Sequence, residues 1–161
     1  MRLKYSRELN EVRNMSRRLL VLVVMAALLA TGVMTVSAQS DTMAATVMLG
    51  GTEALGPFLV DANGMTLYAF ANDTPGVSNC TGQCATNWPP LTVADGETPT
   101  LATGIPGRIN VITRDDGSLQ VTYNGMPLYH WKDDMAAGDT NGQGFKGVWY
   151  VVSPDGTMVQ N

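Results

Sequence analysis

The chain has 161 residues, and its 10 lysines and arginines against 14 aspartates and glutamates give a net charge of −4 at pH 7. This charge is divided unevenly: residues 1–38 hold six basic and two acidic residues, and residues 39–161 hold four basic and twelve acidic ones. The acidic remainder argues against a nucleic-acid-binding protein, because phosphate contacts require a basic surface. A single long apolar run also excludes a protein that crosses the membrane several times.

The first 38 residues have the pattern of an export signal. Residues 19–36 form an uncharged apolar stretch after Arg17 and Arg18, and the small side chains of Ser37 and Ala38 come next. This order is typical of a secretory signal peptide at 1–38, cleaved after Ala38. The alternative is an uncleaved anchor, because 18 apolar residues lie at the lower limit of what spans a bilayer. In both cases we expect an extracytoplasmic domain, secreted, periplasmic or at the cell surface, with membrane contact only through an uncleaved N-terminal segment.

A tandem repeat organises the rest of the chain. When the sequence is shifted by 61 residues, Asn63-Gly64-Met65 falls on Asn124-Gly125-Met126, Leu67-Tyr68 on Leu128-Tyr129, and Trp88 on Trp149. After a short linker at residues 39–45, we therefore predict a single β domain at 46–159 that is made of repeats 46–98 and 108–159.

Both repeats have the residue pattern of β structure. Asn63-Gly64 and Asn124-Gly125 lie between runs rich in Val, Leu, Tyr and Phe. Asn-Gly favours a two-residue hairpin with a type I′ turn, in which both central residues have positive φ. Asp116-Gly117 and Pro154-Asp155-Gly156 predict further turns. We expect an all-β fold with two tandem hairpin-based repeats related by a pseudo-twofold axis, and with long irregular loops at 72–87 and 133–146.

One motif occurs in both repeats and resembles a known family. Residues 68–73 and 129–134 both fit Tyr-x-(Phe/Trp/Tyr)-x-x-Asp, and the surrounding residues 80–91 and 138–149 match as well. This pattern resembles the bacterial secreted-repeat family, also described as predicted lipoproteins, whose biochemical function is not established. The sequence departs from many relatives in lacking a lipobox cysteine, so the resemblance implies export but gives no support to a lipid anchor.

Cys80 and Cys84 are the only two cysteines of the chain. In an oxidising compartment, two cysteines this close are most simply a disulfide. The alternative is a copper site, because two thiolates can bind one soft metal ion with His130, the only histidine, or a methionine as a further ligand.

The aromatic residues and aspartates of the motif allow two interpretations. In a strand, Tyr68 and Phe70 point to the same face, as do Tyr129 and Trp131. These rings, with Trp88 and Trp149, form either the core of each repeat or an exposed platform that stacks on a ligand. Asp73 and Asp134 follow at the entrance to each loop, where an aspartate commonly accepts backbone N–H bonds.

No pattern in the sequence specifies a reaction. The chain lacks a Gly-x-Ser-x-Gly motif, a phosphate-binding loop and a His-rich zinc pattern. We therefore expect a non-enzymatic binding or structural module without a cofactor, whose partner is an unidentified envelope or extracellular ligand. The alternative is an extracytoplasmic copper-handling or electron-transfer protein that uses Cys80 and Cys84.

Overall fold

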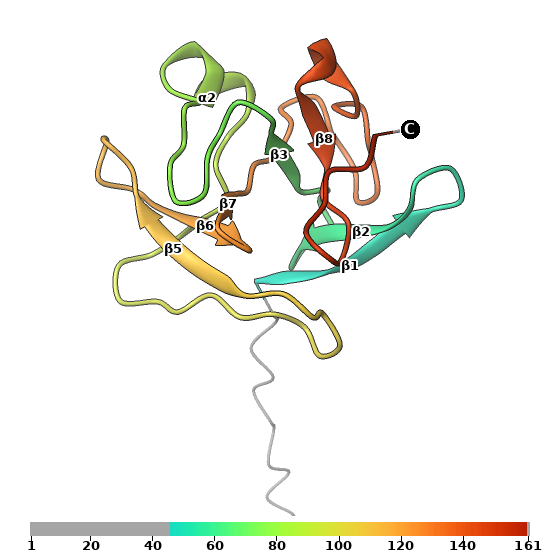
Figure 1. Cartoon of the computed structure of the whole chain (residues 1–161), viewed down its shortest axis with the longest axis horizontal. Helices are drawn as coiled ribbons and strands as arrows, with labels where there is room; N and C mark the ends of the chain where they lie inside the picture. The colour runs from blue at the N-terminus through green and yellow to red at the C-terminus, as the bar shows by residue number, and fades with distance from the viewer. Residues whose placement is uncertain (1–45, 161) are drawn as a thin grey trace, which may run out of the picture. The chain divides into compact units, whose positions relative to one another are not determined.

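The computed structural model describes residues 46–160 (Figure 1). The predicted signal peptide and the linker at 39–45 lie outside this range. Within it, no helix is long and apolar enough to cross a membrane.

Short β-strands account for most of the regular structure, which confirms the all-β prediction. In chain order the elements are β1 (Val47–Thr52), β2 (Gly56–Asp61), β3 (Tyr68–Phe70), α2 (Gln83–Asn87), β4 (Thr92–Val93), β5 (Ile109–Thr113), β6 (Leu119–Tyr123), β7 (Met126–Pro127), the 3-10 helix η1 (Phe145–Gly147) and β8 (Trp149–Val151). Both helices are short.

The strands pair antiparallel, and two of the pairings join the repeats. Strands β1 and β2 form a hairpin within the first repeat, and β5, β6 and β7 form a meander within the second. Strand β3 of the first repeat pairs with β8 of the second, and β4 of the first pairs with β6 of the second. The repeats therefore share their sheets, and Figure 1 shows the β1–β2 hairpin and the β5–β6 hairpin on either side of β3.

The two Asn-Gly turns differ, and the prediction of a type I′ turn is correct for only one of them. Asn124 and Gly125 both have positive φ, 50° and 88°, as type I′ requires. In the first repeat only Gly64 does, at 80°, so that prediction is wrong. The reason is Asp61, whose Oδ1 accepts the backbone N–H of Asn63 at 2.8 Å and of Met65 at 2.9 Å and so fixes a wider turn.

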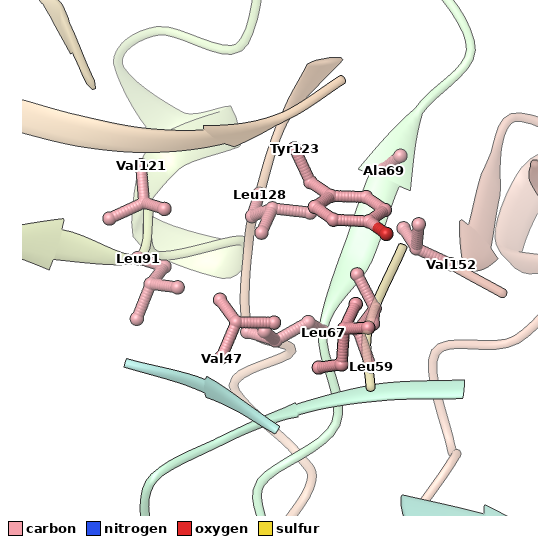
Figure 2. Packing of buried hydrophobic residues seen from close by; sticks show 10 residues of the cluster. Val47, Leu59, Leu67, Ala69, Leu91, Val121, Tyr123, Leu128 and Val152 are labelled. Atoms are coloured by element: carbon pink, nitrogen blue, oxygen red, sulfur yellow. The ribbon is translucent and has the colours of Figure 1, made fainter. Parts of the chain in front are cut away.

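Both hydrophobic clusters are built by the two repeats together, and Figure 2 shows the first of them. Val47, Leu59 and Leu67 come from the first repeat, and Val121 and Leu128 from the second; all five are fully buried. Burying each such side chain contributes roughly 1.5–3 kcal/mol, so a large part of this stabilisation is common to both repeats.

Candidate functional site

The two copies of the motif meet at their tyrosines. The backbone N–H of Tyr68 donates to the carbonyl of Tyr129 at 2.9 Å, and the N–H of Tyr129 donates to the carbonyl of Tyr68 at 2.9 Å. Both side chains are fully buried. This reciprocal pair lies where the predicted pseudo-twofold relation would place its axis.

Each tyrosine hydroxyl donates a hydrogen bond to the aspartate of the other repeat. Tyr68 Oη donates to Asp134 Oδ2 at 2.6 Å, and Tyr129 Oη donates to Asp73 Oδ2 at 2.6 Å. Each aspartate also accepts a backbone N–H of its own loop through Oδ1, from Asn79 at 2.7 Å and from Asn141 at 2.9 Å. The prediction that these aspartates accept backbone N–H bonds is confirmed, whereas the crossed tyrosine contacts were not foreseen.

Burial shifts the ionisation of all four groups. It raises the pKa of the Tyr68 and Tyr129 hydroxyls far above their usual range, and the neighbouring carboxylates raise it further. Burial also raises the pKa of Asp73 and Asp134, although the tyrosine and backbone hydrogen bonds oppose this. Both tyrosines therefore stay protonated and act as hydrogen-bond donors at neutral pH.

The aromatic residues of the motif stack across the boundary between the two repeats. Phe70 of the first repeat stacks on Trp149 of the second, with ring centroids 4.3 Å apart. Trp149 stacks on Trp88 at 3.9 Å with nearly parallel planes, and Trp88 contacts Trp131 at 4.3 Å. The three tryptophans are at most 8% exposed. These rings form a core between the repeats, and the structure does not present them as an exposed platform.

The cysteines form a disulfide, with the Cα atoms of Cys80 and Cys84 5.2 Å apart. This confirms the simpler of the two interpretations. Neither sulfur is a free thiolate, and Nε2 of His130 lies 3.1 Å from Oδ2 of Asp61 instead of beside the cysteines. No group of three His, Cys, Asp or Glu side chains suited to a metal ion occurs within residues 46–160. The structure therefore gives no support to the copper alternative.

Arg114 extends the Tyr129–Asp73 pair toward the surface. Its Nη1 donates to Ser78 Oγ at 2.7 Å, and Ser78 Oγ lies 2.7 Å from Tyr129 Oη. Because the Tyr129 proton is directed to Asp73, the Ser78 hydroxyl donates to Tyr129. A directional chain of hydrogen bonds thus runs from Arg114 through two hydroxyls to the Asp73 carboxylate.

Two further contacts fix the guanidinium of Arg114. Nη1 also donates to Oε1 of the fully buried Gln120 at 2.6 Å, and Nη2 donates to the carbonyl of Cys80 at 2.6 Å. Arg114 therefore holds the disulfide loop against β6. Repeat analysis could not find this residue, because the 61-residue shift places it on Glu53.

A cleft of about 710 Å³ opens beside this arginine. Its first wall is the disulfide loop and α2, through residues 76–78, 81–82 and 85–86, with Pro90 nearby. Its second wall is the end of β5 and the following turn, residues 112–116. We call this feature the Arg114 cleft; it combines segments from both repeats.

The walls of the Arg114 cleft are chemically mixed. Val77 and Ile112 supply apolar surface, and Ser78 is among the hydroxyl-bearing residues of the lining. Asp115 and Asp116 are both exposed. A half-open cavity with apolar walls and a few convergent polar groups is typical of small-ligand sites.

The comparisons with known proteins identify the family but no function. No curated protein and no solved structure matches the chain. The sequence model of a family described as a secreted repeat of unknown function matches twice, over residues 51–92 and 110–153. These matches fall inside the two predicted repeats, cover more than half of the chain and imply export. The chain belongs to this secreted-repeat family.

Proposed function

We propose that the protein is an exported, non-enzymatic binding module and that its ligand site is the Arg114 cleft. The observation that carries this proposal is the cleft itself, at about 710 Å³ within the range of small-molecule sites. It lies between a disulfide-held loop and a β-hairpin, so its walls are fixed before a ligand arrives, which lowers the entropic cost of binding.

The reactive side chains of the motif support binding in preference to catalysis. The Tyr68–Asp134 and Tyr129–Asp73 pairs are buried and hydrogen-bonded to each other and to their loops. Cys80 and Cys84 are held in a disulfide. These groups maintain the fold, and the cleft is left with side chains suited to recognition.

The difference between the repeats also favours this site. Arg114 corresponds to Glu53 under the 61-residue shift, so the second repeat contributes an arginine where the first has an acid. The shared motif residues maintain the common fold, whereas a residue present in one copy alone is free to serve a ligand.

The proposal can be tested by amide chemical shifts in the exported protein labelled with ¹⁵N. We would titrate it with tri-alanine, N-acetylglucosamine, glycerol 3-phosphate and spermidine as probes of peptide, sugar, anionic and cationic ligands. We expect at least one probe to shift the amides of Val77, Thr86 and Thr113 in a saturable way.

A matched pair of variants controls this experiment. Thr86→Trp places a large ring in the cleft at an exposed position of α2 and should abolish the shifts. Thr98→Trp makes the same change at an exposed position outside the cleft and should leave them intact. Shifts that survive Thr86→Trp, or the absence of shifts with all four probes, would contradict the proposed site.

A further inference from the structure

Strand β5 has one edge without a strand partner. It is the last strand of its sheet and pairs with β6 on its other side (Figure 1). The residues on either side of β5 face β6: the carbonyl of Arg108 accepts a hydrogen bond at 2.8 Å, and the N–H of Arg114 donates one at 2.9 Å, to residues that flank β6. Backbone groups alternate in direction along an antiparallel strand, so those of Ile109, Val111 and Thr113 point away from β6.

This free edge lacks the features that normally prevent edge pairing. The outward N–H and C=O groups of the three residues make no hydrogen bond within residues 46–160. Exposed edge strands are commonly protected by a charged side chain, a proline or a bulge. Ile109–Thr113 contains no charged residue and no proline, and its pairing with β6 is unbroken. The edge is therefore open to a further strand.

The two ends of the edge carry opposite charges. Arg108 precedes β5, Asp115 and Asp116 follow it closely, and all three are exposed. None of them takes part in an ion pair within the described part of the chain. When a strand pairs antiparallel with a copy of itself, each end meets the opposite end of the other copy. The arginine of each copy then lies beside the aspartates of the other, and the attraction occurs twice.

These charges also select a register. A twofold axis at Ile112 places Arg108 directly opposite Asp116 of the second copy. An axis one residue earlier, at Val111, would instead place Arg108 opposite Arg114, and like charges that face each other across a strand pair are destabilising. The charge pattern therefore favours the register with Ile112 on the axis.

We infer that two copies of the protein associate through β5, antiparallel about a twofold axis at Ile112, and form one continuous sheet. Val111 and Thr113 of opposite copies exchange backbone hydrogen bonds, and Arg108 pairs with Asp116 of the other copy. Ile112 also lines the Arg114 cleft, so the two clefts open on the same face of the joined sheet. This inference goes beyond the proposed binding activity and does not depend on the ligand.

Strand β1 provides a comparison within the same molecule. The N–H of Val47 donates to the carbonyl of Thr100 at 3.1 Å, so the backbone groups of Leu49 and Gly51 also point away from β2. The charged residue next to this edge is Glu53, and residues 46–56 contain no basic side chain. Two copies of β1 would bring no opposite charges together, so β1 serves as the control edge.

The first test measures the molar mass of the exported protein by sedimentation equilibrium up to millimolar concentration, where weak interfaces associate. We expect the mass to rise toward that of a dimer and no further, because a twofold interface is closed. A monomer at every concentration, or a mass that continues to rise beyond the dimer, would overturn the inference.

The second test removes one donor from each edge. Thr113→Pro deletes an outward N–H that the hairpin does not use, at a position where an edge strand tolerates proline. It should weaken association at least about tenfold. Leu49→Pro makes the same change at an exposed position of β1 and should leave the dimer intact. Equal effects of the two variants, or a normal dimer of Thr113→Pro, would exclude β5 as the interface.

The third test exchanges the charges at the ends of β5. Arg108→Glu makes both ends acidic. The double change Asp115→Lys with Asp116→Asn makes both ends basic and keeps a side-chain oxygen for the N–H of Ser118, which Asp116 now accepts at 2.9 Å. Each variant alone should associate at least about tenfold more weakly than the wild type.

An equimolar mixture of these two variants distinguishes charge pairing from damage to the fold. In the mixture, each acidic end meets a basic end, so we expect a heterodimer of wild-type affinity. A structural defect in either variant would not be repaired by mixing. Variants that dimerise alone like the wild type, or a mixture that stays monomeric, would overturn the antiparallel pairing.

Discussion

Two tyrosines and two aspartates connect the repeats residue by residue. Each tyrosine donates to the aspartate of the other motif, and each aspartate accepts from its own loop. The carboxylate therefore fixes a loop of one repeat to the backbone bridge at the centre of both. This double role explains why tyrosine and aspartate recur together in both copies of the motif.

The tyrosine hydroxyls should contribute measurably to stability. Tyr68→Phe removes a donor from Asp134, and Tyr129→Phe removes one from Asp73, so each leaves a buried carboxylate with a weaker set of partners. We expect each variant to lower the free energy of unfolding by about 1–3 kcal/mol in urea titrations at neutral pH. Tyr150→Phe is the matched control, because Tyr150 is only half-buried on β8 and makes no side-chain hydrogen bond within residues 46–160. Losses no larger than in this control would contradict the role of the hydroxyls.

The buried aspartates should give the protein an unusual acid response. Burial is the main cause that raises the pKa of Asp134 above 3.8. The folded state then binds the proton more tightly than the unfolded chain, so the contribution of this group to stability is fully present below about 3.8 and is lost as pH rises through the raised pKa. The stability of the wild type relative to Asp134→Asn should therefore increase as the pH falls from about 7 to about 4.

Asp155 supplies the control of opposite sign. Hydrogen bonds from the Ser153 and Thr157 side chains and from the backbone N–H of Thr157 lower the pKa of this exposed carboxyl to about 2. The contribution of Asp155 to stability is present above pH 3.8 and is lost as the pH falls toward about 2. Urea unfolding of Asp134→Asn, Asp155→Asn and wild type at several pH values checks both trends. If the free energy of unfolding of the wild type relative to Asp134→Asn instead decreased on acidification, the raised pKa of Asp134 would be contradicted.

Sequence reasoning at this scale found the repeated aspartates and the cysteine pair, and it missed Arg114. The capping role of Asp73 and Asp134 and the Cys80–Cys84 disulfide are confirmed. Arg114 gave no signal, because a single arginine in one repeat is indistinguishable from an ordinary surface charge before its contacts are known.

Among the elements, the turns show how one side chain changes a predicted conformation. Asn63-Gly64 and Asn124-Gly125 have the same central residues, but the residue two positions before the asparagine is Asp61 in one turn and Thr122 in the other. Thr122, which the repeat shift aligns with Asp61, has no carboxylate to accept two backbone N–H groups. A dipeptide rule that ignores flanking acceptors therefore predicts the second turn correctly and the first incorrectly.

The disulfide loop should be stabilised by its cross-link but should not depend on it entirely. The double change of Cys80 and Cys84 to serine frees a very short loop, for which the chain-entropy model gives about 2 kcal/mol. Arg114 still holds the loop through the backbone carbonyl of residue 80, so we expect a loss of this size with the fold retained. Reductant should destabilise the wild type by a similar amount and leave the serine variant unaffected. A wild type that is insensitive to reductant would contradict the cross-link.

Across the whole described region, the repeats cannot be separated without breaking shared structure. Strands β3 and β8 pair across them, β4 and β6 do the same, and Trp88 stacks on Trp149. The sequence predicted the repeats, and the family matches fall within them. It could not predict that the repeats share strands and side-chain contacts. The 61-residue shift shows only which residues are equivalent. A tyrosine could donate to the aspartate of its own repeat or to that of the other repeat, and the sequence is the same in both cases.

Because the two repeats share strands and buried contacts, we predict a single cooperative unfolding transition. Leu67 and Leu128 are equivalent residues of the two repeats, and both are fully buried in the shared cluster of Figure 2. Leu67→Ala and Leu128→Ala should each lower the free energy of unfolding by about 2–5 kcal/mol. Because each cavity lies in a core that both repeats need, far-ultraviolet circular dichroism and tryptophan fluorescence should report one coincident transition in both variants. If Leu67→Ala instead unfolded in two steps, with the second repeat persisting, the repeats would be independent units and the exchanged contacts would not govern stability.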